Sequence, residues 1–218
     1  GDEVTWTITS PVLGVHDGKT IEKFGLRDPL DSKLEYVAGS MVITLVDGTT
    51  ETPLTDDFTI GYPDPSVPGD TLTAVAKDAA LEELNAASAT AYVTFVFKTT
   101  VHGAGTLVNQ GVVNVGDVDY TTNEKETEWG LAKLIKQDEA NQKKLAGATF
   151  KVYAMPAGTT TCDATTGATG TEIQTHTTGA DGTFTTDAIK AGTIVCFEEI
   201  AAPAGYVLPE GDAAWFGP

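Results

Sequence analysis

Two adjacent carboxylates on an apolar strand, Glu198 and Glu199 within residues 195–209 (VCFEEIAAPAGYVLP), constrain the fold most strongly. Successive side chains of a β-strand point to opposite faces, so one of the two glutamates must face the interior of a covered sheet. Val195 and Phe197 share a face with Glu199, which places Glu199 inside and Glu198 toward water. A buried carboxyl without a cation is costly to ionise, so Glu199 is expected to hold its proton and to act on a nearby partner.

Lys136 is the candidate partner. The period-two pattern in residues 130–136 places Ala132, Leu134 and Lys136 on one face, and a turn-rich run then leads to a second predicted strand at residues 148–153. Lys136 would therefore enter the same core as Glu199. In the plainer alternative, the lysine at a strand end extends to solvent and the Glu-Glu pair lies on a solvated face.

Three segments together resemble a known family: Lys-x-Asp at 136–138, LAGATFKVY at 145–153 and E-x-x-A-P-x-G-Y at 199–206. They are similar to the Cna-B domain, with its E-box, of sortase-assembled pilins from Gram-positive bacteria. The resemblance implies that a strand lysine attacks the side-chain amide of an asparagine (sometimes an aspartate) on the last strand, while the E-box glutamate relays the proton. Lys136 and the catalytic Glu199 match these roles, and the acceptor strand is expected beyond Pro218.

Length and patterning predict an all-β chain of two tandem Ig-like β-sandwiches, divided as residues 1–126 and 127–218. Residues 120–128 are polar and charged and are predicted to form the linker. The remaining predictions for the first domain are a strand at 4–8, a loop at 52–70, one short helix at 75–87, and strands at 91–101 and 106–115.

The first domain resembles the Cna-A-like middle domain of actinobacterial shaft pilins, through GDEVTWTI at 1–8, DPLD at 28–31 and LVNQGVVNV at 107–115. The resemblance implies that Asp28 is the catalytic acid of a second isopeptide bond and Asn109 its acceptor. The lysine of that bond is expected before Gly1. Three lysines of the chain are weaker alternatives: Lys19, Lys23 and Lys33.

Asp28 and Asn109 also have plainer interpretations. Asp28 precedes Pro29 and could cap a turn, and Asn109 could be an edge-strand amide.

The chain contains two cysteines, Cys162 and Cys196, which lie in the same predicted domain. In an exported protein a disulfide between them is expected, and two unpaired buried thiols are the alternative. A metal site built on this pair lacks support from further cysteines or histidines.

Charge excludes one class of partner and leaves others open. With 31 acidic and 13 basic residues the net charge is −18, which argues against binding nucleic acid. No apolar run of membrane-spanning length occurs, so no membrane insertion is expected of these residues. No cofactor is expected, although the acidic loop could hold Ca²⁺ without the spacing of an EF-hand; its carboxylates are those of Asp56, Asp57, Asp64 and Asp70.

These observations favour a structural subunit of a covalently polymerised, cell-wall-anchored pilus, with other pilin subunits as partners through sortase linkage. Its only chemistry would be autocatalytic isopeptide formation. A second hypothesis is an adhesin or tip pilin that binds a host matrix protein or glycan, which an exposed aromatic groove would favour. A third, a glycosidase using Glu198 and Glu199, is disfavoured because adjacent strand residues point apart.

Overall fold

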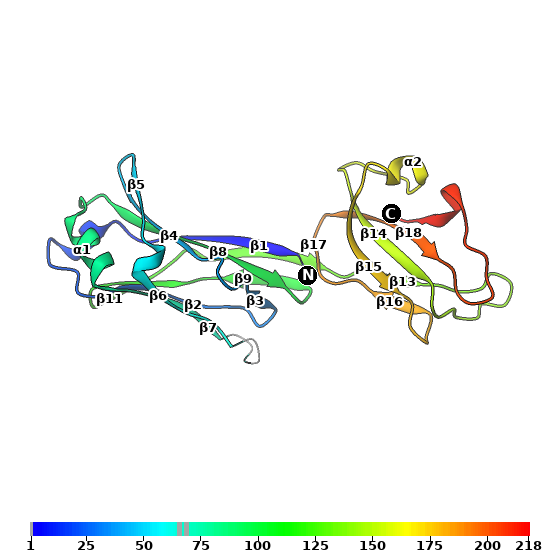
Figure 1. Ribbon diagram of the computed structural model, residues 1–218, viewed down its shortest axis with the longest axis horizontal. Coiled ribbons are helices and arrows are strands. Elements are labelled where there is room, and N and C mark those ends of the chain that lie inside the picture. Colours follow the sequence, from blue (N-terminus) through cyan, green and yellow to red (C-terminus); the bar gives the residue numbers. More distant parts are fainter. Residues whose placement is uncertain (1, 65–66, 68–69) are drawn as a thin grey trace. The chain divides into compact units, whose positions relative to one another are not determined.

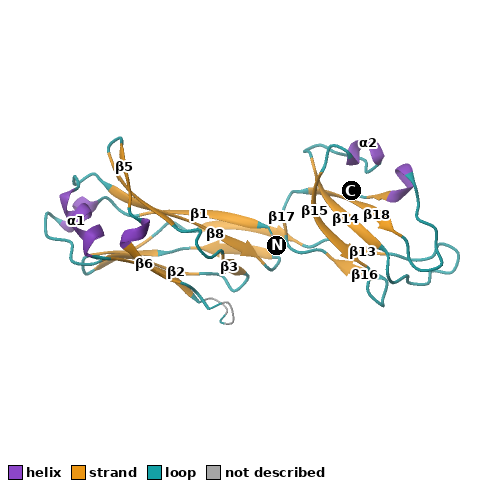
Figure 2. Ribbon diagram, in the orientation of Figure 1, coloured by secondary structure: helices purple, strands orange, loops and turns teal. Residues whose placement is uncertain are grey.

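The computed structural model describes residues 2–64, 67 and 70–218, which divide into two compact units, Gly1–Glu128 and Trp129–Pro218 (Figure 1). The predicted division, between residues 126 and 127, lies two residues earlier than this one. Strands dominate both units (Figure 2). No helix among the described residues is long and apolar enough to span a membrane.

The first unit is a sandwich of two five-stranded sheets. One sheet has the order β1-β8-β4-β5, with β3 also paired to β8; its strands are β1 (Glu3–Thr9), β3 (Leu34–Tyr36), β4 (Val42–Asp47), β5 (Thr50–Pro53) and β8 (Tyr92–Val101). The other has the order β11-β10-β2-β7-β6; its strands are β2 (Phe24–Pro29), β6 (Phe58–Gly61), β7 (Thr71–Ala76), β10 (Val112–Val115) and β11 (Val118–Thr121).

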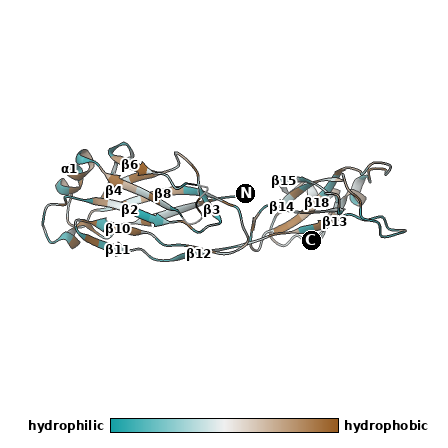
Figure 3. Cartoon of the chain, turned by 90° about the horizontal axis from the view of Figure 1, so that it is seen from below, coloured by the Kyte–Doolittle hydropathy of each residue, from teal (hydrophilic) through white to brown (hydrophobic). Residues whose placement is uncertain are grey.

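Alternating apolar residues explain why the two sheets pack face to face. Trp6 and Ile8 of β1 are buried and lie opposite Phe97 and Phe95 of β8. Phe95 in turn stacks on Phe24 of β2, with ring centroids 6.1 Å apart. Brown, apolar segments along strands such as β4 and β10 mark this core in Figure 3. The predicted alternation of β1 and the long strand β8 are therefore present in the structure.

The helix of the first unit is shorter than predicted. Helix α1 spans Asp78–Ala86, whereas Val75 belongs to strand β7. Leu72 and Ala74 are fully buried and Val75 is 56% exposed, so a period of two continues through this segment. An apolar run that joins a strand to a helix does not show where one period gives way to the other.

Three other segments of the first unit differ from the prediction. The expected loop at 52–70 contains the end of β5, a 3₁₀ helix (Thr55–Asp57) and β6. The single strand predicted at 106–115 is divided into β9 (Gly105–Asn109) and β10. The predicted linker contains the second half of β11 and most of β12 (Lys125–Gly130), which pairs with β9. Backbone pairing needs no apolar pattern, which is why these polar strands were not evident from the sequence. A further 3₁₀ helix spans Leu13–His16.

The second unit encloses its core between a two-stranded and a four-stranded sheet. Phe150 and Phe184 form the core with Ala148, and Leu134 and Phe197 pack against it. The strands are β13 (Lys133–Ile135) with β16 (Thr183–Thr185), and then β15 (Thr171–Thr177), β14 (Thr149–Met155), β18 (Ile194–Ala201) and β19 (Trp215–Phe216) in spatial order. β17 (Ile189–Lys190) pairs with Trp129 and Gly130 of β12, and a 3₁₀ helix spans Gly211–Ala214.

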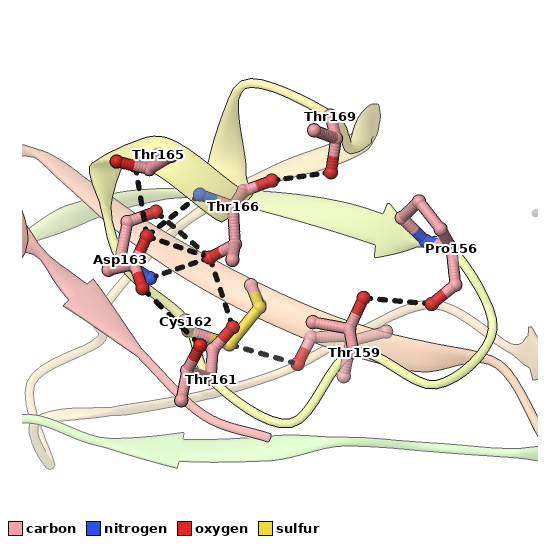
Figure 4. The surroundings of a disulfide bond; sticks show 10 residues. Pro156, Thr159, Thr161, Cys162, Asp163, Thr165, Thr166 and Thr169 are labelled. Carbon is pink, nitrogen blue, oxygen red and sulfur yellow. Dashed lines mark hydrogen bonds between the residues drawn. A yellow bond between two sulfur atoms is a disulfide. The ribbon is translucent and has the colours of Figure 1, made fainter.

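A disulfide between Cys162 and Cys196 fixes a loop over the outer face of the four-stranded sheet, which confirms the predicted pairing. The loop contains the one-turn helix α2 (Ala164–Gly167), which the sequence analysis missed. Figure 4 shows the Asp163 side chain accepting hydrogen bonds from the N–H groups of Thr165 and Thr166, a capping box that starts this turn.

Replacement of both cysteines by alanine should destabilise the second unit by about 3 to 4 kcal/mol, because the bond closes a long loop in the unfolded chain. The two cysteines are 34 residues apart. Differential scanning calorimetry should show the melting of the second unit shifted down and that of the first unchanged. Equal melting of the variant and the parent protein would contradict the expectation.

Candidate functional site

Lys136 and Glu199 form a close ion pair inside the second unit. Lys136 directly follows β13, and Glu199 lies on β18, where it pairs with Phe150 of β14. The Lys136 Nζ lies 2.6 Å from Glu199 Oε2, and the side chains are 22% and 0% exposed. The strand alternation that predicted an inward Glu199 is observed, and the predicted neighbour is in contact with it.

Apolar groups surround this pair and leave one polar atom unsatisfied. The Lys136 amine lies 5.7 Å from the centre of the Phe216 ring, which also packs against Phe150. Glu199 Oε1 is buried and has no hydrogen-bond partner among the described residues. A buried acceptor without a donor costs free energy, so a polar group that donated to this oxygen would stabilise the site.

Glu198 lies on the opposite face of β18, as the alternation requires, but it is half-buried instead of solvated. It accepts a hydrogen bond of 2.7 Å from the Tyr153 hydroxyl. Burial and the neighbouring Glu198 carboxylate raise the pKa of Tyr153. The Tyr153 ring contacts Trp215, whose indole packs against Gly167 of the disulfide-bonded loop. Glu198 thus binds the hydroxyl of Tyr153, whose ring packs on the outer face of the four-stranded sheet.

A hydrogen bond connects two of the three sequence motifs that carry the resemblance, Lys-x-Asp at 136–138 and E-x-x-A-P-x-G-Y at 199–206. The Tyr206 hydroxyl donates to Asp138 Oδ2 at 2.7 Å, which lowers the pKa of Asp138. Asp138 comes two residues after Lys136, and Tyr206 follows the turn at Gly205, which has φ +85°. The contact therefore fastens the loop after the lysine strand to the loop after the glutamate strand. Sequence reasoning identified both motifs but not this contact.

Asp28 and Asn109 meet inside the first unit. Asp28 is on β2 and Asn109 at the end of β9, with exposed fractions of 0% and 4%. The Asn109 Nδ2 donates to Asp28 Oδ2 at 3.0 Å. Asp28 Oδ1 and Asn109 Oδ1 are buried without a partner among the described residues. The predicted neighbours are together. Asp28 is not an exposed turn cap, and Asn109, although it ends the edge strand β9, is buried against Asp28.

Asn109 also lines a groove of about 490 Å³ that runs along β1. Residues 4–9 form one wall of the groove, and Thr122, Asn123, Lys125, Glu126 and Thr127 contribute to the other. In its sheet β1 pairs only with β8, so the groove borders an open strand edge. An extended segment placed in this groove would lie beside Asn109.

The three weaker lysine candidates lie elsewhere. Lys23 pairs with Asp117 at 3.4 Å, the Lys33 side chain packs against Gly103, and Lys19 is exposed. The structure therefore gives none of them a contact with the Asp28–Asn109 pair.

Metal-binding geometry is absent from the described part of the chain. In residues 2–64, 67 and 70–218, no group of three or more His, Cys, Asp or Glu residues is arranged to hold a metal ion. The acidic loop considered for Ca²⁺ includes Asp70, whose carboxylate accepts hydrogen bonds from the N–H groups of Asp64 and Thr71.

Asp28→Asn should stabilise the first unit at neutral pH. Burial raises the pKa of Asp28 from 3.8 to about 6, opposed by the Asn109 hydrogen bond. Because the folded state favours the protonated carboxyl, the contribution of Asp28 to the free energy of unfolding is complete below pH 3.8. It is lost as the pH rises through 6, a change of roughly 3 kcal/mol. Urea unfolding at pH 4 and 7.5, monitored by hydrogen exchange of the β2 amides, should show this loss of stability in the parent protein and not in Asp28→Asn.

The exposed Asp117→Asn is the matched control and should leave the pH dependence unchanged. A pH dependence in Asp28→Asn equal to that of the parent protein would refute the assignment.

Lys136→Met should destabilise the second unit by about 3 to 5 kcal/mol at neutral pH, because it leaves the Glu199 charge buried and unpaired. Adding Glu199→Gln to this variant should recover much of the loss. The exposed pair between Lys151 and Glu172 provides the control, and Lys151→Met should have a much smaller effect. Thermal unfolding of the single and double variants measures the coupling between Lys136 and Glu199. Additive effects of the two substitutions would show that the residues are not coupled and would contradict the prediction.

Comparisons with known proteins agree with this fold. Residues 130–213 match the family model of the SpaA prealbumin-like fold domain. Domains D2 and D3 of the major pilin SpaD from Corynebacterium diphtheriae superpose with a TM-score of 0.73 at 26% identity, covering 100% of this chain and 83% of that one. Full-length SpaD superposes with a TM-score of 0.69 at 26% identity over 99% of this chain. This chain spans 56% of the length of full-length SpaD.

The Actinomyces fimbrial adhesin FimA has the same fold, with a TM-score of 0.69 at 24% identity over 98% of this chain and 88% of that one. A comparison with curated protein sequences gives no match. The second unit is therefore similar to the SpaA prealbumin-like fold domain, and the chain as a whole is similar to the shaft pilins of Gram-positive bacteria.

Proposed function

We propose that this chain is the part of a pilus shaft subunit that carries tensile load, and that each of its two units is closed by a Lys–Asn isopeptide bond. The observation that carries the proposal is the Lys136–Glu199 pair, an amine and an acid held 2.6 Å apart in an apolar core. The Asp28–Asn109 pair repeats the arrangement of a buried acid beside a reaction partner. The similarity to SpaD over the whole chain supports a pilin role.

In the second unit, Lys136 is the nucleophile. Proton transfer within the pair gives a protonated Glu199 and a neutral amine, which is the form that can act as a nucleophile. The amine attacks the carbonyl carbon of an asparagine amide, and Glu199 Oε1, which lacks a partner, is the atom available to polarise that carbonyl. The new C–N bond replaces the bond to the amide nitrogen, which leaves as ammonia after accepting a proton through Glu199.

In the first unit, Asn109 is the acceptor and Asp28 is the acid. The lysine comes from an extended segment in the groove along β1, where Asn109 is one of the lining residues. The pKa of Asp28, raised to about 6, suits a carboxyl that accepts and returns a proton near neutral pH. A lysine amine in this site would also satisfy the two orphan oxygens of Asp28 and Asn109.

Such bonds fit a mechanical role. A β-sandwich under tension fails when its terminal strands separate, because only hydrogen bonds and side-chain packing hold them. A covalent bond between the first and last strands transfers the load to the bond. Subunits of this kind would be linked to other pilin subunits by sortase and anchored to the cell wall, and the fibre would display adhesive surfaces to host or other cells.

Glu199→Ala should abolish cross-linking in a form of the protein that contains the acceptor strand, while the unit still folds. Intact-mass spectrometry should show the loss of one ammonia per closed bond in the parent protein, and no loss from the second unit in the variant. Glu198→Gln is the matched control, because it changes the adjacent carboxylate but retains an acceptor for Tyr153. Cross-linking of Glu199→Ala at the parental rate would refute the proposed role of Glu199.

A further inference from the structure

A cavity of about 440 Å³ opens on the first unit, away from the residues of both proposed cross-links. Its floor includes the buried Leu30 and Leu34, and its walls include Tyr36 and Tyr62. This volume falls within the range of small-ligand sites, which typically combine apolar walls with a few polar groups.

The two tyrosines form a fixed aromatic wall. The Tyr36 hydroxyl accepts a hydrogen bond from the Met41 N–H at 3.1 Å, and its ring lies 6.3 Å from that of Phe97. Tyr62 packs against Tyr36, with ring centroids 5.6 Å apart and planes tilted by 31°. Tyr62 is nevertheless 59% exposed, and its hydroxyl has no hydrogen bond to another described residue. Tyr62 therefore presents an accessible aromatic ring, and the Tyr36 ring behind it is held in place by its hydrogen bond and its packing.

The remaining charges of the cavity are mostly negative. The carboxylates of Glu35, Asp64 and Asp70 line it, and no lysine or arginine is present among its described lining residues. The Asp70 carboxylate is held by the N–H groups of Asp64 and Thr71, at 2.6 and 2.7 Å. Glu35 lies 2.7 Å from His102 and is about half exposed, so it remains accessible to a ligand. An anion would be repelled here.

We propose that this cavity binds an organic cation, an ammonium or guanidinium group on an apolar stem. The aromatic face of Tyr62 attracts the cation, the carboxylates complement its charge, and Leu30 and Leu34 accommodate the stem. The ligand is either a lysine or arginine side chain of a partner polypeptide or a small free amine, which share this chemistry. The proposal stands apart from the isopeptide chemistry, because it uses none of the residues assigned to it.

Nuclear magnetic resonance titration of the ¹⁵N-labelled chain tests the proposal. The probes are n-butylammonium, as a free amine, and the capped peptide acetyl-Gly-Lys-Gly-amide, with acetyl-Gly-norleucine-Gly-amide as the uncharged match of the peptide. We expect either cation to produce saturable chemical-shift changes at the amides of Glu35, Tyr36 and Tyr62 at millimolar concentrations. The norleucine peptide should produce none. A response only to the peptide would identify a polypeptide side chain as the ligand, and a response to both would identify the cationic group alone.

Variants distinguish specific binding at this cavity from the general attraction of cations to an acidic protein. Tyr62→Ala should weaken binding about tenfold and Tyr62→Phe should retain it, because phenylalanine keeps the aromatic face. Glu35→Gln should weaken binding several-fold, whereas Glu51→Gln on the exposed strand β5 should not. Three results would overturn the proposal: no saturable shifts with either cation, equal binding of the norleucine peptide, or equal effects of the Glu35 and Glu51 substitutions.

Discussion

The structure of the second unit depends on the compensation of a buried charge. Strand alternation directs Glu199 into the core together with Phe197, and this orientation is tolerated because Lys136 reaches the same point from β13. The first unit meets the same constraint less completely. Its buried carboxyl, Asp28, has an amide instead of a cation for a partner, and burial raises its pKa to about 6 against the opposing effect of the Asn109 hydrogen bond. Both units thus place an acid where water cannot stabilise its charge.

Much of this arrangement could be predicted from the sequence, because period-two alternation determines the face to which a strand residue points. It predicted the inward orientation of Glu199, Trp6 and Ile8 and directed Lys136 toward the same core as Glu199. The motif resemblance then matched Lys136 and Glu199 to the roles of nucleophile and acid. The likeness to SpaD and the match to the SpaA prealbumin-like domain support that resemblance. The roles of Glu199, Asp28 and Asn109 in bond formation remain predictions.

The features that could not be predicted arise from long-range contacts without a local pattern. Strand β12 owes its existence to backbone pairing with the distant strands β9 and β17, whereas the polar strand β11 pairs with the adjacent strand β10 in a hairpin. Similarly, the Tyr206–Asp138 hydrogen bond joins residues 68 positions apart, and Tyr62 reaches Tyr36 through the folding of two sheets. A sequence shows which side chains are available for such contacts, but the partners are determined by the packing of the whole unit.

The disulfide has a consequence for how far the second unit can be extended. A pulling force that unfolds this unit cannot separate Cys162 from Cys196, so the 34-residue separation between them adds almost nothing to the extended length. At about 3.4 Å per residue, this removes roughly 115 Å of contour length. The loop that the disulfide closes contains β15, β16 and β17. Those strands are therefore shielded from the applied force, and the end-to-end extension of the unit comes from the segments outside the loop.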